Sequence, residues 1–595
     1  MKRSECCDKY KWDLTKIFEN DIVFYKELED FTNEMNSITK YKNNILKSSS
    51  NLLEFIETSN NLDRKIEKLY TYAHLNMDSE TSNSKYQEMM QKVEDVYKNY
   101  LSLTSFIVPE MLKEEYSLVE GYIKENKLLE KYAYNLEVIY REKGHQLDEA
   151  TSYLLSRFSG VLGSGASLFE TLTDTDMKFG VIKVDSKEVE LNESNYSIYV
   201  SSNNRDTRRN AWTRLHEVYG SYKNTLTSTY NKYMEYMVTL AEITNYKSAL
   251  CASLASDNIK EEVYLNLIDE VNNNLDVLHK YYKLEKEVLK LDEMHIYDTY
   301  AKMEKDLEIE YDYDKAKELV VKAMSVLGDD YVEDLKQAFT CRWIDVYHND
   351  SKRGGAYSSG MYDTYPYILL NYENRLRDVS TLAHELGHSM HSYYSHKYND
   401  YNNSSYKIFV AEVASTVNEL LLAKYMIKHS TNKKEKKYIL NELLDLFKST
   451  IYRQTMFAEF EYITHKLKED GTPITNELLS NMYLDLNKKY FGHDVVVDDL
   501  IKYEYLRIPH FYYNFYVYKY AIGLSSACKI VNDILSGKDG AREKYRKFLT
   551  LGGSQDPVDE LMVAGVDVLD KNLYKDAILM FSSLIDEYRR IDENE

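Results

Sequence analysis

The stretch Thr381-Leu382-Ala383-His384-Glu385-Leu386-Gly387-His388-Ser389-Met390-His391 decides the local fold around which the rest of the chain is organised. It predicts a helix, in which residues four apart lie one above the other, so the imidazoles of His384 and His388 can point at one position. Neutral imidazole is a good ligand for Zn²⁺, and Glu385 lies close enough to accept a proton from a water on the metal. The stretch therefore predicts a helix that presents two metal ligands and a base.

The neighbours of the two histidines indicate that this helix is buried. They are mostly apolar, namely Leu382, Ala383, Leu386 and Met390. Buried paired histidines need partners, and a metal supplies one. His391 shares the face but lies about 10 Å from His384 along the axis, so we expect it to have a supporting or structural role. Asp378 fits the N-cap of the helix, which we favour over a role in holding a ligand.

A catalytic zinc site needs a third protein ligand, and the next apolar stretch offers two acids. The run Phe409–Ala423 predicts a helix with Glu412 and Glu419 seven residues apart and near one face. A buried acid without a partner is costly, and a zinc ion would remove that cost. We take Glu412 as the third ligand, with Glu419 as the alternative that spacing leaves open.

Composition predicts a large, mainly helical globular protein. The chain has 595 residues, 44% of them hydrophobic, with only 5 Pro and 20 Gly to break helices. The formal net charge of -22 opposes binding to nucleic acid or to an anionic membrane. We therefore expect neither kind of partner, while the sequence leaves the oligomeric state open.

The cysteines and the apolar runs indicate the compartment. The five cysteines lack the spacing of a metal motif, and their odd number suggests free thiols in a reducing environment. Neither a signal peptide nor an apolar run of about 18 residues is visible. We expect a cytoplasmic protein.

Along the chain the sequence suggests three regions. Residues 1–110 predict an N-terminal helical arm, and residues 111–190 a further lobe that ends in a hairpin strand at Phe179–Asp185. Residues 204–297 predict more long helices. We assign 200–590 to the domain that carries the metal site.

The composition changes just before the helix that contains His384 and His388, and this change predicts a small β-sheet. The segments 343–347, 351–360 and 365–371 are aromatic, β-branched and interrupted by glycines. A free edge of such a sheet can hold an extended peptide through backbone hydrogen bonds, and Gly354 and Gly355 would allow close approach. A plain glycine turn between two ordinary strands fits this pattern at least equally well.

The segment 507–523 combines a histidine with many tyrosines. Interpreted as a helix begun by Pro509, it places His510, Tyr513, Tyr516 or Val517, and Tyr520 along one face. A phenol can donate a hydrogen bond to the oxyanion that forms when a peptide carbonyl is attacked. Simple packing is the alternative, because the chain contains 57 Tyr.

Together these motifs resemble the oligoendopeptidase F family, within the thimet-oligopeptidase-like zinc metallopeptidases. The resemblance is carried by HELGHSMH and FVAEVAST, preceded by KRGGAYSSGMYD and PYILLN. It extends to KWDLTKIF near the N-terminus, to residues 204–297 and to the C-terminal tyrosine cluster, and so covers most of the chain.

The resemblance implies a mainly α, two-lobed enzyme with a deep substrate channel that cleaves internal bonds of short peptides. It also implies that Glu412 is the third ligand of one Zn²⁺ per chain. The family's His and Tyr cluster binds substrate and stabilises the transition state, so we assign His510, Tyr513 and Tyr520 catalytic roles and Tyr516 a binding role. The spacing from the histidine to the first tyrosine is shorter here, which leaves the division of roles among the tyrosines open.

The expected mechanism is hydrolysis by a water on zinc, with Glu385 accepting the proton of the water and passing it to the departing amine. Two other functions fit parts of the sequence. One is an exopeptidase with the same metal chemistry, and the other is a helical scaffold that binds metal without turnover. Mn²⁺ or Co²⁺ could also support such a site.

Overall fold

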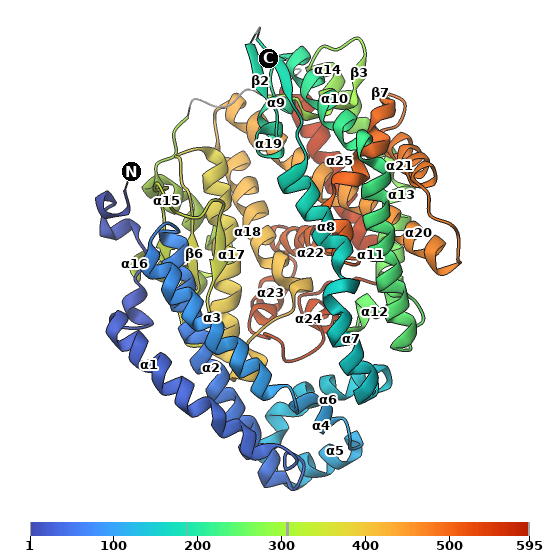
Figure 1. Cartoon of the computed structure of the whole chain (residues 1–595). Coiled ribbons are helices and arrows are strands. Elements are labelled where there is room, and N and C mark those ends of the chain that lie inside the picture. Colours follow the sequence, from blue (N-terminus) through green and yellow to red (C-terminus); the bar gives the residue numbers. More distant parts are fainter. Residues whose placement is uncertain (1, 186, 305–308, 593–595) are drawn as a thin grey trace. The chain divides into compact units, whose positions relative to one another are not determined.

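The structure, a computed structural model, describes residues 2–185, 187–304 and 309–592. Within these ranges the chain forms two compact units, each assembled from three segments. The first comprises residues 2–144, 309–426 and 530–566, and the second the described parts of 145–308 together with 427–529 and 567–592. Figure 1 shows that helices dominate, which confirms the predicted mainly α class.

The first unit contains the metal helix, the small sheet before it and the N-terminal helices. Its α-helices are α1 (Asp21–Glu34), α2 (Ser49–Ser79), α3 (Ser84–Thr104), α4 (Ile107–Met111), α5 (Tyr116–Glu125), α6 (Ala133–Arg141), α15 (Tyr313–Met324), α16 (Asp329–Thr340), α17 (Leu376–Tyr398), α18 (Ile408–His429) as far as Met426, α23 (Ala541–Leu549) and α24 (Pro557–Val563). Its strands are β4 (Ile344–Asp345), β5 (Tyr357–Ser359) and β6 (Tyr367–Leu369).

The second unit contains the long helices predicted for residues 204–297 and the tyrosine-rich segment. Its α-helices are α7 (Glu149–Leu162), α8 (Ser164–Glu170), α9 (Glu193–Val200), α10 (Arg205–Ser221), α11 (Lys223–Ile243), α12 (Ala249–Ala255), α13 (Glu261–Asn273), α14 (Leu275–Val288), α19 (Lys433–Phe447), α20 (Gln454–Glu469), α21 (Asn476–Phe491), α22 (Tyr518–Leu535) as far as Lys529, and α25 (Lys571–Asp592). Its strands are β1 (Val181–Val184), β2 (Lys187–Glu190), β3 (Met294–His295) and β7 (Val495–Val496). The antiparallel pairing of β1 with β2 confirms the predicted hairpin strand.

The N-terminal segment packs into the core of the first unit. Trp12, Ile17 and Phe18 are buried with the apolar faces of α1, α2 and α3, and Tyr367 and Leu369 of β6 belong to the same core. The ring of Trp12 meets that of Tyr367 edge to face at 6.2 Å. Burial of such large side chains is the main favourable contribution to folding, so this core fixes the sheet against the N-terminal helices.

The predicted sheet before the metal helix is confirmed, with strand order β4-β6-β5. Strand β6 pairs in parallel with β4 and antiparallel with β5, and Ser358 lies opposite Ile368. Strand β5 therefore lies at an edge.

In the described part of the chain, no helix combines the length and apolar composition that a membrane crossing requires.

Candidate active site

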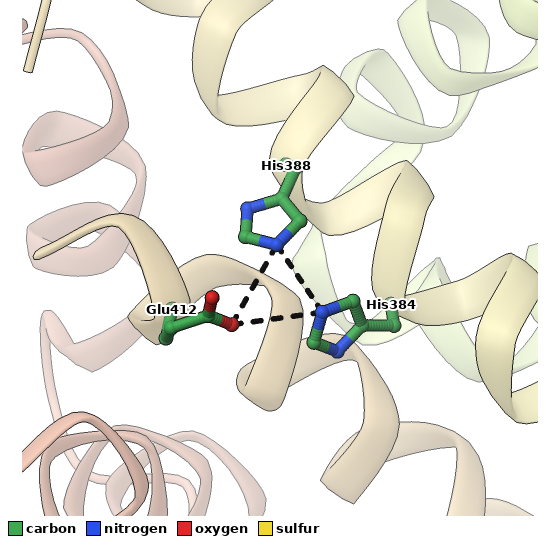
Figure 2. A group of neighbouring side chains, drawn as sticks. All are labelled: His384, His388 and Glu412. Atoms are coloured by element: carbon green, nitrogen blue, oxygen red, sulfur yellow. Dashed lines mark hydrogen bonds and ion pairs between the residues drawn. The ribbon is translucent and has the colours of Figure 1, made fainter. Parts of the chain in front are cut away.

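Two histidines of α17 converge as their spacing predicts. The Nε2 atoms of His384 and His388 lie 3.2 Å apart, since one helical turn brings both rings to the same side of α17. Figure 2 shows both rings directed at the carboxylate of Glu412. Its Oε2 lies 3.6 Å from each Nε2 atom.

Glu412 reaches this position because α18 packs very closely on α17. A Cβ atom at Gly387 would lie 2.5 Å from the carbonyl oxygen of Ala414, so only glycine fits between the two histidines. The buried amide of Asn418 donates to the carbonyl of Ala383 at 3.1 Å and ties the helices together. These contacts set the distance from α18 to the two histidines.

The three side chains fit a tetrahedral zinc ion. With bonds of 2.0–2.2 Å, neighbouring ligand atoms of such an ion lie roughly 3.3 Å apart, close to the three separations found here. Without a cation, two ring nitrogens would face each other and a carboxylate. The side chains of His384, His388 and Glu412 remain 26%, 18% and 39% exposed, which leaves access for a small molecule. The set therefore has the ligands and the open side of a catalytic site.

The opposite nitrogen of each ring also has a partner. Nδ1 of His384 lies 3.3 Å from Oε1 of Glu419, and the backbone carbonyl of Ala411 raises the pKa of the His388 ring. Such contacts fix the tautomer and orientation of a ligand histidine and leave the other nitrogen for the metal. Glu419, which spacing allowed as the third ligand, thus faces the far side of His384, and Glu412 faces the converging atoms.

The acids around the histidines favour a positive charge at this position. Burial lowers the pKa of His384, but the carboxylates of Glu419, Glu385 and Glu412 together raise it to about 9. Burial and the neighbouring His384 charge lower the pKa of His388. The two histidines thus accept one positive charge readily and a second one poorly. A single cation would therefore balance the neighbouring carboxylates.

Glu385 is buried beside this group, on the same helix. Burial raises its pKa to about 7, with a lowering effect from His384 and further raising effects from Glu412 and Glu419. The backbone N–H of Ser358 in β5 has a smaller, lowering effect on this pKa. A carboxyl group with a pKa near neutrality can both accept and return a proton at physiological pH.

The predicted binding glycines lie in the loop before β5. Gly355 has φ of +84°, and neither Gly354 nor Gly355 has a neighbouring atom within 4 Å of the Cβ position. The side-chain amide of Asn371 donates to the carbonyls of Arg353 and Gly355, at 3.0 and 2.8 Å. The loop is therefore held from one side while its glycines border open space.

The predicted helix starting at Pro509 is wrong. Only Pro509–Tyr512 forms a short 3₁₀ turn, and α22 starts at Tyr518. Between them Asn514 and Phe515 are left-handed, with φ of 46° and 57°. The buried Phe515 side chain packs on His465, and its N–H donates to Glu461 at 2.7 Å. These contacts hold a backbone conformation that a helix excludes.

The predicted side chains nevertheless gather in the second unit. The His510 ring centre lies 5.7 Å from that of Tyr513, 6.4 Å from that of Tyr516 and 6.1 Å from that of Tyr520. Tyr513 is 54% exposed, and Tyr516 and Tyr520 meet edge to face at 5.4 Å. We call these four residues the His510 cluster. It combines the 3₁₀ turn, the loop and the start of α22 rather than one helix face.

Two further expectations concern α17. His391 is buried and stacks on Tyr406 with ring centres 3.8 Å apart, a structural role that agrees with its distance from the ligands. The N-cap is Arg375 rather than Asp378. Asp378 lies at the third helical position, where its carboxylate accepts the backbone N–H groups of Glu373 and Arg375. It thus stabilises the helix start from inside the helix.

Comparisons with known proteins identify the family of this chain. Residues 198–578 match the family described as peptidase family M3, and residues 110–179 match the one described as oligopeptidase F. The chain belongs to peptidase family M3. It is 41% identical to oligopeptidase PepF of Bacillus subtilis, over 99% of this chain and 88% of that protein.

Solved structures of similar proteins share the fold. The structure of oligoendopeptidase-F from Enterococcus faecium is 31% identical with a TM-score of 0.75, covering 97% of this chain and 100% of that one. A crystal structure from Chlamydophila abortus is 35% identical with a TM-score of 0.93, covering 99% of both chains. Membership of family M3 makes this chain a metallopeptidase, which confirms that it is a hydrolase.

Sequence analysis missed several contributors to this M3 peptidase site. The contact of Glu419 with the far nitrogen of His384, the carbonyl of Ala411 and the amide of Ser358 all act through tertiary proximity. A signal existed for Gly387 alone, since a glycine inside a buried helix is costly and suggests a close helix contact.

Proposed function

We propose that this M3 peptidase is a zinc-dependent endopeptidase that hydrolyses internal bonds of short oligopeptides. The observation that carries the proposal is the convergence of His384, His388 and Glu412 next to the buried carboxyl group of Glu385. In the described part of the chain, His384, His388 and Glu412 form the one group of three or more His, Cys, Asp or Glu residues whose ligand atoms lie close enough together to hold a metal ion. This supports one ion per chain. The names of its relatives, oligopeptidase and oligoendopeptidase, support short peptides as substrates.

Each residue of the site has its own role in the proposed reaction. His384, His388 and Glu412 would hold zinc, which when bound polarises a peptide carbonyl and makes water a better nucleophile. Glu385 accepts the proton of the attacking water and delivers it to the departing amine, a task that suits its pKa of about 7. The edge of β5 and the Gly354–Gly355 loop bind the peptide backbone. His510, Tyr513 and Tyr520 stabilise the developing oxyanion, and Tyr516 contacts the substrate.

Other parts of the proposal concern organisation and compartment. We assign residues 1–110 to an N-terminal arm, 111–190 to an oligopeptidase F-type lobe and 200–590 to the catalytic domain. The family matches at 110–179 and 198–578 support the last two boundaries. In the described part of the chain no disulfide joins Cys6, Cys7, Cys251, Cys341 or Cys528, which supports a reducing, cytoplasmic environment. The deep substrate channel stays a prediction.

The test is hydrolysis of an internally quenched peptide of roughly ten residues that is blocked at both ends, with zinc content measured on every sample. Glu385→Gln is expected to retain zinc and to lose about 10²–10⁴-fold in kcat. The matched control is Glu373→Gln, a change of an exposed acid just before α17, which is expected to retain full activity.

Each alternative gives a different result. Cleavage of unblocked peptides alone would make the protein an exopeptidase. Bound zinc without turnover of any peptide would favour the scaffold. Near-normal hydrolysis by Glu385→Gln would refute the role given to this residue, and restoration of the apoprotein by Mn²⁺ or Co²⁺ but not by Zn²⁺ would refute the choice of metal.

A further inference from the structure

A buried acid of the N-terminal helices holds the strand next to Glu385. Asp78 is 3% exposed and lies in the last turn of α2. Its carboxylate accepts the hydroxyl of Tyr357 at 2.8 Å and pairs with the Arg353 guanidinium at 3.2 Å. His74, one turn earlier, lies 3.2 Å from the same oxygen, Oδ2. Asp78 therefore joins α2 to the segment 353–357.

The main chain of α2 makes the same connection. The carbonyl of Asp78 accepts the N–H of Arg353 at 2.9 Å. Beyond the helix end, the N–H of Thr81 donates to the carbonyl of Ser351 at 2.7 Å. The end of α2 thus runs along the chain just before the Gly354–Gly355 loop, and Asp78 provides the charged contacts of this junction.

The other side of β5 faces the metal helix. Successive residues of a strand point to opposite faces, so Tyr357 and Ser358 diverge. The hydroxyl of Ser358 lies 2.8 Å from that of Ser389 in α17, one turn beyond Glu385, and the backbone N–H of Ser358 lowers the pKa of Glu385. Two neighbouring residues of one strand thus connect Asp78 on one side with Glu385 on the other.

Gly354 and Gly355 lie between the two residues that Asp78 binds. They border open space and supply no side-chain contacts of their own. Glycine is the most flexible residue, so the position of this loop depends on its neighbours. Asp78 fixes Arg353 before the glycines and Tyr357 after them, while Asn371 holds the carbonyl groups.

We propose that Asp78 is a positioning residue for peptide binding. It holds the edge strand β5 and the Gly354–Gly355 loop in the register that presents their backbone groups to an extended peptide beside Glu385. This inference rests on the proposed function, because it assumes that the edge of β5 binds substrate. It assigns to the N-terminal helices a part in substrate recognition, although they contain none of the metal ligands.

The test compares two helix-α2 acids. Asp78→Ala removes the side-chain contacts to Arg353 and Tyr357 but keeps the main-chain hydrogen bond to Arg353, whereas Asp78→Asn retains an acceptor for the tyrosine hydroxyl. The matched control is Asp63→Ala, because Asp63 lies in the same helix, accepts the hydroxyl of Tyr100 at 2.8 Å and makes no contact with the sheet. Tyr357→Phe removes a single hydrogen bond and provides a milder variant, in case Asp78→Ala does not fold.

The measurements are KM and kcat for the end-blocked peptide, zinc content, and the Kd of a labelled uncleaved peptide in the Glu385→Gln background. Asp78→Ala is expected to raise KM and Kd about 10- to 100-fold with zinc content unchanged. Asp78→Asn and Tyr357→Phe are expected to lie between Asp78→Ala and the wild type. Asp63→Ala is expected to lower thermal stability but to leave KM near that of the wild type.

Equal KM values for Asp78→Ala and Asp63→Ala would overturn the inference. It would also be overturned if Asp78→Ala lost zinc and this loss caused its raised KM. Peptide binding and cleavage by the wild type separate this result from failure of the proposed function. If the wild type cleaves the peptide and Asp78→Ala binds it normally, the positioning role alone is refuted. If the wild type neither binds nor cleaves it, the proposed function fails and the inference fails with it.

Discussion

Gly387 lies directly against the backbone of Ala414, so closely that a Cβ atom on the glycine would be 2.5 Å from the Ala414 carbonyl oxygen and 2.5 Å from the Cα of Ser415. This contact lies between the two histidine ligands on one helix and within three residues of Glu412 on the other. The spacing of α17 and α18 therefore determines the geometry of the proposed metal site.

Gly387→Ala is expected to push α18 away from α17 and weaken zinc binding at least tenfold. Overpacking of this kind also destabilises by about 1–3 kcal/mol. The measurements are zinc content after dialysis against a chelator and the midpoint of thermal unfolding. The control is Gly121→Ala in α5, where nothing lies within 4 Å of the new methyl group. There the helix propensity of alanine is expected to leave stability equal or raised, and unchanged zinc affinity in Gly387→Ala would refute the argument.

Glu419→Gln is expected to weaken zinc binding about 10- to 100-fold, because the carboxylate orients His384 and strengthens its ligand nitrogen. Glu412→Gln changes the proposed third ligand itself and is expected to lose more of the zinc affinity. Titration with a competing chelator measures both affinities. If Glu419→Gln strips the metal while Glu412→Gln retains it, the assignment of ligand and orienting residue must be exchanged.

Tyr520→Phe is expected to lower kcat up to about 10²–10³-fold, with zinc content unchanged, if its hydroxyl stabilises the oxyanion. Tyr512→Phe is the matched control. Tyr512 belongs to the same segment, but it is buried and its hydroxyl lies 2.8 Å from that of Thr229. This control is expected to lose stability and retain kcat, and steady-state kinetics of both variants decide between catalysis and packing.

Glu461 predicts a pH dependence of stability. Burial raises the pKa of this carboxyl group to about 8, with a smaller lowering effect from the Phe515 N–H. Because the folded pKa exceeds the unfolded value, the protonated group favours the folded state at low pH. This stabilisation is complete below about pH 4.5, decreases as the pH rises, and is lost above pH 8.

Glu461→Gln removes this titration and keeps an acceptor for the Phe515 N–H. Its stability relative to the wild type is therefore expected to rise between pH 5 and pH 8.5. Thermal or urea unfolding of both proteins at several pH values measures the difference. The wild type also contains Glu285 and Glu560, whose pKa values burial raises to about 8 and about 9, so the comparison must be between variant and wild type. A pH-independent difference would show that Glu461 is ionised throughout.

Local patterns predicted the parts of this protein that depend on neighbours in the sequence. The four-residue spacing of His384 and His388 sufficed to place both rings on one side of α17, because helix geometry alone dictates it. The aromatic and β-branched composition of residues 343–371 predicted the small sheet. The alternating pattern of residues 179–185 predicted the hairpin strand. The choice of Glu412 over Glu419 needed the family resemblance, since both acids lie near one face of the helix.

The helix predicted from Pro509 failed because a local pattern lost to tertiary contacts. The offsets of His510, Tyr513 and Tyr520 match a helix face, yet Asn514 and Phe515 adopt left-handed conformations. The burial of Phe515 and the acceptor oxygen of Glu461 stabilise that turn, and Glu461 lies 54 residues away in the chain. The prediction that the side chains of the His510 cluster lie close together was thus correct, but the helix from which it was made does not form.

The sequence by itself predicted the helical class, the convergence of His384 and His388, and the proposed base Glu385, because these follow from composition and from helical periodicity. Tertiary structure decided which nitrogen of each histidine is free, which acid of α18 faces the ligand atoms, and which N-terminal acid holds β5. Those choices depend on distances of a few ångströms between segments far apart in the chain. Such distances are set by packing, as at Gly387 and Ala414, and no local periodicity encodes them.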